Sequence, residues 1–472
     1  MSIFVVVGTT GVGKSALAVK LAKALSGHVI NADSMQVYKG LDIVTNKPDA
    51  NELAMAPHHL FDFLDPAKEY SVSEFSRDAT AIIDELNTKN EPSVICGGTN
   101  YYIQSLLWSQ SIIETATTPG LSNKAAILES AHHSLDPSLA DTLCYLLEHT
   151  DPRTNTPDQI SEFSKTAPFH DTLKQIDPVM AQRWHPNDIR KIRRSLEVFY
   201  TTGISHSDWY ASQRNESNPD TRLRYPTCVF WLYGRPDKLN PRLDARVDQM
   251  IDKGMFDELN DMRKKMTKNE VVGVQSQYTR GILQAIGFKE FHDYFVAEEN
   301  GEIDRLDDLR MKGIEEMKIA TRQYAKRQVS WIKNKLAPQC VIEHEEGSGA
   351  LYLIDATDVE NLNDDLYNKV IELAQNFNAK KPNESSTLLA PKLDDLDLLS
   401  MRIADASEWE QYTCDVCTIK STGQKKILNG LHEWETHLKS GVHKKALSYI
   451  KKNQAWQEYI EKQKRQKLNA DE

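Results

Sequence analysis

The stretch from Gly8 to Ser15 carries the strongest chemical signal in the chain. It follows the pattern G-x-x-x-x-G-K-S, and its members are Gly8, Thr9, Thr10, Gly11, Val12, Gly13, Lys14 and Ser15. An apolar run precedes it at 3–7, and a helical pattern follows it at 16–25. In this order of strand, glycine loop and helix, backbone N–H groups bind phosphate oxygens, Lys14 adds a positive charge, and the hydroxyl of Ser15 can hold Mg²⁺. The stretch therefore predicts a P-loop, a nucleotide-type site for a di- or triphosphate.

Two further polar residues follow apolar runs in the same part of the chain. Asp33 comes shortly after Val29-Ile30, and Thr99 follows the run at 93–96. Ligands of an open parallel sheet bind at the carboxyl ends of its strands, so we expect both residues to lie beside the P-loop. An acid there can ligate Mg²⁺, act as a general base on an acceptor, or only cap a turn. The residues alone leave these three roles open.

Basic residues gather at three places outside the P-loop. A helix is predicted after Asp188, because apolar residues recur there at helical spacing, and its charged residues fall outside that apolar face: Arg190, Lys191, Arg193 and Arg194. Further along, Arg242 and Arg246 are four residues apart and share a helix face, and a third group lies at 321–328. Each group is either a solvated face paired with internal carboxylates, or a site for RNA phosphates or a diphosphate.

The C-terminal region contains a separate cysteine and histidine pattern. Its members are Cys414, Cys417, His437 and His443, with the spacing C-x₂-C-x₁₉-H-x₅-H. Two thiolates and two imidazoles suit tetrahedral Zn²⁺, and four protein ligands leave no open position, as in structural sites. The alternative is four unrelated residues. Several lysines follow His443, so we also predict a basic tail that contacts phosphates.

The order of elements predicts how these groups are positioned. Strand and helix patterns alternate through 1–107, strand signals vanish between about 110 and 225, and a strand pattern returns at 228–233. We therefore predict an α/β protein with a P-loop NTPase-like parallel sheet, a helical insertion domain and a small C-terminal Cys2His2 zinc finger. The predicted bounds are 1–110 and 226–357 for the core, 111–225 for the insertion, 358–406 for a linker, 407–447 for the zinc finger and 448–472 for the tail.

Composition narrows the classes of protein. The net charge of −11 over 472 residues argues against a uniformly basic nucleic-acid binder, although it permits local basic patches. The six cysteines are too scattered for a disulfide framework, and four of them resemble buried thiols of a reducing compartment: Cys96, Cys144, Cys228 and Cys340. No apolar run approaches the roughly 20 residues of a transmembrane helix, and the early first strand leaves no room for a signal peptide. We expect a cytoplasmic protein, with a nuclear pool as an alternative; a mitochondrial form is not visible.

Six further motifs, in order along the chain, resemble those of one family. They are Asn31–Tyr38, Pro57–Leu60, Gly97–Tyr102, His185–Asp188, Arg242–Val247 and Thr321–Gln328. Together with the P-loop they resemble the tRNA dimethylallyltransferase (tRNA isopentenyltransferase) family over about residues 1–336, while the segment 111–180 matches it poorly. The zinc pattern resembles the eukaryotic type of that family.

The resemblance implies transfer of a dimethylallyl group from its diphosphate to N6 of adenosine 37, beside the anticodon. It implies that Asp33 is the general base, that Thr10 assists catalysis, and that Arg246 binds the leaving diphosphate with the P-loop. It further implies Mg²⁺ at Ser15 and a structural Zn²⁺. The expected partners are dimethylallyl diphosphate and a tRNA anticodon stem-loop, and we expect a monomer that does not associate with a membrane. The implied tRNA-binding residues are Asp33, Ser34, Met35, Gln36, Thr99, Asp188, Arg190, Lys191, Arg193, Arg194, Arg322, Gln323 and Arg327.

Two rival functions fit parts of the sequence. A small-molecule P-loop kinase would explain the P-loop and Asp33, but it leaves the insertion, the zinc pattern and the basic tail without a purpose. An RNA-binding protein without catalytic activity would explain the zinc pattern, but not the combination of Lys14, Ser15 and Asp33.

Overall fold

The computed structural model describes residues 1–108, 137–150, 157–213, 222–268, 278, 281–345, 349–358, 362–381, 410–418, 425–452 and 456. The chain divides into two compact units. The first contains Met1–Ile113 and Asn215–Arg402, and the second contains Glu114–Arg214 and Ile403–Glu472. The predicted helical insertion and the predicted zinc finger therefore belong to the same unit.

A six-stranded parallel sheet organises the first unit. Its strands are β1 (Ile3–Gly8), β2 (His28–Asn31), β3 (His58–His59), β4 (Ser93–Cys96), β5 (Thr227–Tyr233) and β6 (Gly349–Asp355). They lie in the order β3-β2-β4-β1-β5-β6, and each neighbouring pair is parallel. Because helices cover both faces, the strands read as continuous apolar runs, and β5 is buried along its whole length. The predicted fold class is confirmed, although the short strand β3 has no apolar signal of its own.

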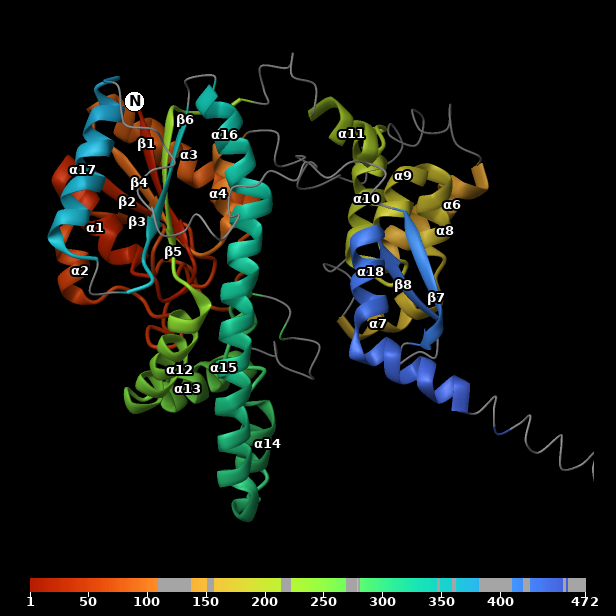
Figure 1. Ribbon diagram of the computed structural model, residues 1–472. Coiled ribbons are helices and arrows are strands. Elements are labelled where there is room, and N and C mark those ends of the chain that lie inside the picture. The colour runs from red at the N-terminus through yellow and green to blue at the C-terminus, as the bar shows by residue number, and fades with distance from the viewer. Residues whose placement is uncertain are drawn as a thin grey trace, which may run out of the picture. The chain divides into compact units, whose positions relative to one another are not determined.

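Two helical layers enclose this sheet (Figure 1). On one face lie α1 (Lys14–Leu25) and α17 (Asp364–Asn378), with α2 (Ala50–Met55) beside α1. On the other lie α3 (Val72–Lys89) and α4 (Asn100–Leu107). The linker predicted for 358–406 is wrong at its N-terminal end, because α17 buries Tyr367, Val370, Leu373 and Ala374 in the core. The rest of that linker, from residue 382, lies outside the described residues.

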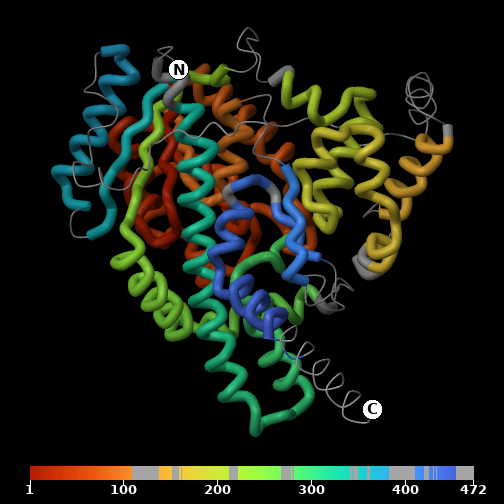
Figure 2. Tube along the Cα trace, turned by 45° about the vertical axis from the view of Figure 1, so that its right-hand side comes forward, coloured from red at the N-terminus to blue at the C-terminus, as the bar shows by residue number. Residues whose placement is uncertain are grey.

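Further helices extend beyond the carboxyl ends of the strands. They are α12 (Pro236–Asp252), α13 (Met255–Lys268), η4 (Gly281–Gln284), α14 (His292–Glu299), η5 (Ile303–Arg305) and α15 (Leu306–Trp331). A third hydrophobic core lies among them. Figure 2 shows α15 continuing through a π-helical turn, η6 (Ile332–Leu336), into α16 (Ala337–Glu345). Residues at the start of this continuous element pack in the third core, and residues toward its end pack against the sheet.

The second unit combines a helical bundle with a small zinc-finger-like module. The bundle contains α6 (Pro137–His149), α7 (Pro157–Thr166), α8 (Phe169–Ile176), α9 (Pro178–Arg183), α10 (Ile189–Thr202) and α11 (His206–Gln213), which share one core. The module contains an antiparallel hairpin of β7 (Gln411–Thr418) and β8 (Lys425–Asn429), followed by α18 (Leu431–Lys439). The helices of the bundle fall within the segment 111–225 predicted as a helical insertion, whose residues 111–136, 151–156 and 214–221 lie outside the described ranges.

The thiols outside the zinc pattern agree with prediction except at one position. Cys96, Cys228 and Cys340 are buried, and none of the six cysteines forms a disulfide. Cys144 is only half-buried, because it packs at the margin of the bundle core. None of the described helices is both long enough and apolar enough to cross a membrane.

Candidate functional site

Glycines shape the phosphate loop between β1 and α1. Gly11 and Gly13 have φ angles of 79° and 86°, where an L side chain would be strained. A Cβ on Gly11 would also lie 2.7 Å from Cδ2 of Leu243. Since α1 begins at Lys14, directly after the loop, the loop N–H groups and the helix N-terminus together form an anion site.

The ammonium group of Lys14 is enclosed by protein atoms, although the residue as a whole is half-buried. Its Nζ donates a 2.7 Å hydrogen bond to the carbonyl oxygen of Thr9. Burial lowers the pKa of Lys14 to about 8, while the nearby carboxylate of Asp33 acts in the opposite direction. An anion that reached this ammonium group would stabilise its charged form.

Arg246 of α12 contacts Thr10 of the phosphate loop. Its Nη1 donates a 3.1 Å hydrogen bond to the hydroxyl oxygen of Thr10. Burial lowers the pKa of Arg246, and the carboxylate of Asp33 again opposes this effect. Its Nε is shielded from solvent and has no hydrogen-bond partner among the residues that the structure describes. A buried donor without a partner is costly, so the guanidinium is suited to receive an anionic ligand.

Asp33 lies just beyond the carboxyl end of β2. Its Oδ1 accepts a 2.9 Å hydrogen bond from the N–H of Met35, and its own N–H donates to Oδ1 of Asn31 at 3.1 Å. The hydroxyl oxygen of Thr99 accepts from the N–H of Ser34 at 2.9 Å, so the loops after β2 and β4 are joined. The predicted meeting of the P-loop, Asp33 and Thr99 at one rim of the sheet is therefore present in the structure.

A pocket of about 350 Å³ opens between these loops and the helices beyond the sheet. Its polar lining includes Thr10, Asp33, Ser34, Arg246, Tyr324 and Arg327. Its apolar lining includes Met35, Leu243, Val247, Met250, Ile286 and Met317. One cavity thus combines a carboxylate, guanidinium groups and an extended hydrophobic wall.

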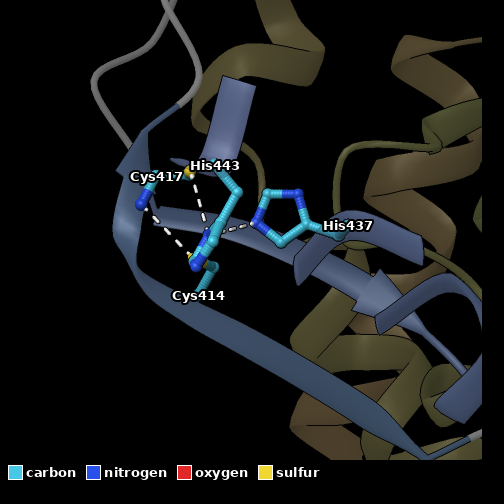
Figure 3. Close-up of side chains that lie close together, drawn as sticks. All are labelled: Cys414, Cys417, His437 and His443. Carbon is cyan, nitrogen blue, oxygen red and sulfur yellow. Dashed lines mark hydrogen bonds between the residues drawn. The ribbon is translucent and has the colours of Figure 1, made fainter. Parts of the chain in front are cut away.

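The four residues of the C-terminal pattern form a second, separate cluster. Figure 3 shows their side chains converging, two cysteines from β7 and two histidines from α18 and the residues after it. All four are buried: Cys414, Cys417, His437 and His443. Nδ1 of His443 lies 3.5 Å and 3.6 Å from the two sulfur atoms and 3.2 Å from Nε2 of His437. Tetrahedral Zn²⁺, with bonds of about 2.0 to 2.3 Å, requires ligand atoms about 3.3 to 3.8 Å apart, so the cluster fits this metal.

Comparisons with known proteins agree with this arrangement. The family model "IPP transferase" matches residues 36–335, and the model "Isopentenyl transferase" matches residues 1–61. The chain is 36% identical over 452 residues to a tRNA dimethylallyltransferase of Schizosaccharomyces pombe, with 93% of each chain covered. It is 32% identical over 461 residues to one of Homo sapiens, covering 96% of this chain and 86% of the relative.

A solved structure of a eukaryotic dimethylallyltransferase acting on tRNA matches with a TM-score of 0.73 and 31% identity. The match covers 97% of this chain and 99% of that chain. The chain belongs to the tRNA dimethylallyltransferase family.

The tRNA-binding residues expected of a dimethylallyltransferase have different surroundings in the first unit. Arg327 is exposed, lines the pocket and lies over the ring of Tyr324. Arg322 instead pairs with Asp244 of α12. Gln323 is exposed, and Gln36 donates from Nε2 to the carbonyl oxygens of its own loop. Only some of these predicted residues therefore face the pocket.

The basic helix of this transferase, α10, carries its charges on the surface of the second unit. Asp188 caps the helix by accepting from the N–H of Lys191, and it also pairs with that lysine. Arg193 and Arg194 both pair with Glu197. Arg190 is exposed. Arg190, Lys191 and Arg194 are accessible, whereas the Arg193 side chain is 20% exposed and also donates from Nε to the Thr150 hydroxyl. Acids of the same helix or its cap pair with three of these four residues.

Gln411 connects the zinc module of the transferase to the bundle. Nε2 of Gln411 in β7 lies within hydrogen-bond distance of three carbonyl oxygens at the C-terminal end of α9. The distances are 3.3 Å to Ala181, 2.9 Å to Gln182 and 3.1 Å to Trp184. Because the last carbonyls of a helix lack partners within it, Gln411 supplies what α9 cannot. No pattern in the sequence predicts this contact.

Sequence reasoning also missed two residues of the active site. Tyr324 lines the pocket, and Gln328 is buried beside it. Both belong to the recognised run 321–328, and their spacing of four places them on one face of α15. That spacing could have identified both residues, whereas the arginines of the same run were the ones predicted to bind.

Proposed function

We propose that this transferase moves the dimethylallyl group of dimethylallyl diphosphate to N6 of adenosine 37, beside the anticodon of a tRNA. The pocket carries the proposal. It places the carboxylate of Asp33 in the same cavity as Arg246 and Thr10, against an apolar wall. A base, an anion site and a place for a hydrocarbon chain are the three parts that this reaction needs.

The bonds that change in the proposed reaction match these parts. N6 of the adenosine attacks C1 of the dimethylallyl group, the C1–O bond breaks, and the diphosphate leaves with the bonding electrons. The proton that N6 loses passes to Asp33, which acts as a general base. Negative charge grows on the leaving oxygen, and Lys14 and Arg246 are positioned to stabilise it. Since the Thr10 oxygen accepts from Arg246, its own O–H is free to donate to the diphosphate.

Mg²⁺ is the metal proposed at the P-loop. The hydroxyl of Ser15 is at the start of α1, in a half-buried residue, and has no side-chain partner within the described part of the chain. Hydroxyl and phosphate oxygens are ligands that Mg²⁺ accepts. Bound there, the ion would neutralise charge on the leaving diphosphate. At the zinc cluster, we propose that the bound metal is a structural Zn²⁺.

The apolar wall bears on the choice of donor. Met35, Val247 and Met317 can contact a branched five-carbon chain, whereas ribose and a polar triphosphate would gain little from them. We therefore expect dimethylallyl diphosphate to bind better than ATP, although the P-loop also suits nucleotides. A competition titration between the two would decide this, and tighter binding of ATP would favour a kinase.

Recognition of tRNA requires the target base to leave its stack. The N6 amine of a stacked adenine cannot reach a pocket, so the nucleotide must be extruded into it. Ser34 and Met35 line the pocket and are proposed to contact the extruded base, while α10 is proposed to contact the stem-loop backbone. Because Lys191, Arg193 and Arg194 exchange surface ion pairs for phosphate contacts, each should add only modestly to affinity.

Incubation of the purified protein with dimethylallyl diphosphate, Mg²⁺ and unmodified tRNA tests the proposal. We expect nucleoside analysis to detect N6-isopentenyladenosine, and a tRNA with another base at position 37 is the matched control. A protein that leaves tRNA unmodified but transfers phosphate from ATP to a small acceptor would instead be the rival kinase. A protein that binds tRNA and modifies nothing would be the rival RNA-binding protein.

A further inference from the structure

A single buried amide of α15 connects two loops of the active site. Gln328 of α15 is only 3% exposed. Its Oε1 accepts a 2.9 Å hydrogen bond from the N–H of Thr10 in the P-loop. Its Nε2 donates a 3.0 Å hydrogen bond to the carbonyl oxygen of Gly98, in the loop after β4. The donor and the acceptor of the side chain are thus both used, one on each side of the site.

Close packing fixes the geometry around Gly98. A Cβ on Gly98 would lie 2.6 Å from Nε2 of Gln328 and 3.2 Å from Oδ2 of Asp33. The hydroxyl of Tyr324 also donates to the carbonyl oxygen of Gly98, at 3.2 Å. The space that a side chain at Gly98 would fill is therefore already lined by the Gln328 amide, the Asp33 carboxylate and the Tyr324 hydroxyl. A shift of Gln328 would change the position available to Asp33.

The hydrogen bond to Thr10 has a different consequence. In a P-loop, backbone N–H groups commonly serve the phosphates. Here Gln328 already occupies the N–H of Thr10, so this peptide is held by α15 and not by the ligand. The Thr10 hydroxyl, which accepts from Arg246, is held by the same peptide. Gln328 therefore orients the side of the site where the diphosphate leaves.

We propose that Gln328 is a positioning residue of the transfer reaction, and this inference rests on the proposed function. Its amide holds Thr10 and the Gly98 loop at a fixed separation. The carboxylate that takes the N6 proton and the groups that stabilise the leaving diphosphate are thereby held in place at the two bonds that break, N6–H and C1–O. Gln328 itself contacts neither the base nor the diphosphate, so its effect falls on the rate of the chemical step.

Two substitutions separate positioning from simple support of the fold. Gln328→Met keeps length and volume but removes both hydrogen bonds. Gln328→Glu keeps an acceptor for the N–H of Thr10, but its carboxylate cannot donate to Gly98. The matched control is Gln339→Met in α16, which removes a partly buried amide contact with Gln104 away from the pocket.

Single-turnover transfer rates at saturating tRNA are the main measurement. We expect Gln328→Met to lower this rate about 10²-fold, the scale of a misplacement of about 1 Å. Affinity for inorganic diphosphate should change less than about threefold, and Gln339→Met should resemble the wild type. For Gln328→Glu, the rate relative to wild type should rise as pH falls from 8 to 6, because a protonated carboxyl regains the donor for Gly98.

The outcomes distinguish this inference from the proposed function. If the wild type modifies no tRNA, the proposed function fails first. If the wild type is active and Gln328→Met retains more than a third of its rate, the positioning role is wrong. Should Gln328→Met not fold, as judged by its thermal transition, Gln328→Glu decides alone. A rate ratio for that variant that does not change with pH would overturn the proposal.

Discussion

The two units hold their functional side chains in opposite ways. In the first unit, charged groups are enclosed and short of partners: the ammonium of Lys14 is surrounded by protein, and Nε of Arg246 is buried without a partner in the described ranges. In the second unit, the charges of α10 are at the surface and are balanced by Glu197 and Asp188. Enclosed charges depend strongly on a ligand, whereas exposed pairs contribute little each.

The two units also differ in what supports their sites. The pocket rests on strands and helices with three large hydrophobic cores. In the described residues, the zinc module has a two-stranded hairpin, the nine-residue helix α18 and a second helical segment at 441–452 around its four ligands. A module of this size cannot form a sufficient core and relies on its metal and its neighbours. Single changes should therefore abolish chemistry in the first unit and weaken binding in the second.

Loss of the general base should have the largest effect and would test the first half of this comparison. We expect Asp33→Asn to lower the single-turnover rate by about 10²- to 10⁴-fold, because N6 then has no acceptor for its proton. Donor binding should remain nearly intact, since the diphosphate contacts lie on the P-loop and Arg246. Quench-flow rates and donor titration measure the two quantities, and a mutant with wild-type turnover would remove Asp33 from the mechanism.

Removal of the zinc ligands tests the second half. We expect Cys414→Ser to release the metal and to weaken tRNA binding about tenfold, with a shallower dependence on salt, because avidity from a second contact and its phosphate contacts are lost. The single-turnover rate at saturating tRNA should stay within about threefold of the wild type. Metal analysis and filter binding check the first result. A mutant that keeps its affinity but loses the chemical step would place the zinc module in the active site.

The pH dependence of diphosphate binding sharpens the contrast between enclosed and exposed charge. Because burial lowers the pKa of Lys14 to about 8, the free protein loses this charge above pH 8 and must take up a proton to bind an anion. We expect affinity to fall about fivefold more between pH 8 and 9 than in Lys14→Arg, which stays charged.

The same pKa has a consequence for folding. The folded protein releases the proton of Lys14 at a lower pH than the unfolded chain does, so this group makes folding more favourable as pH rises from about 8 toward the ordinary value of 10.5.

The predicted proton uptake on diphosphate binding is measured by calorimetry in buffers of different ionisation enthalpy. Equal uptake by wild type and Lys14→Arg would contradict the assignment.

The smallest expected effect concerns the docking of the zinc module. Gln411→Ala removes the donor that serves the last carbonyls of α9, and a lost hydrogen bond of this kind costs about 1 kcal/mol. We expect tRNA affinity to fall about threefold without a change in zinc content. Thr413→Ala, an exposed neighbour on β7, is the control. Proteolysis of the chain between the helical bundle and the zinc module should become faster in Gln411→Ala and not in Thr413→Ala. Equal rates in the two variants would show that the contact does not stabilise the docking of the module.

Local patterns were sufficient for much of the fold and the site. The P-loop could be predicted because its glycines, lysine and serine are contiguous and their chemistry is local. The zinc ligands could be predicted because thiolates and imidazoles at such spacing have few other uses. Helix α17 was missed, since its apolar residues are interrupted by charged ones and it fell within the range 358–406 predicted as a linker.

The sequence by itself determined the chemistry of this protein: a phosphate loop, an acid after a buried strand, a basic helix and a closed set of zinc ligands. Only the tertiary structure decided which residues join these parts. Gln328 follows Thr10 by more than three hundred positions, and Gln411 lies far from α9 in the chain, so no spacing rule connects them. Their amides matter because buried or terminal N–H and C=O groups must find partners, and only the packed fold shows which partner is within reach.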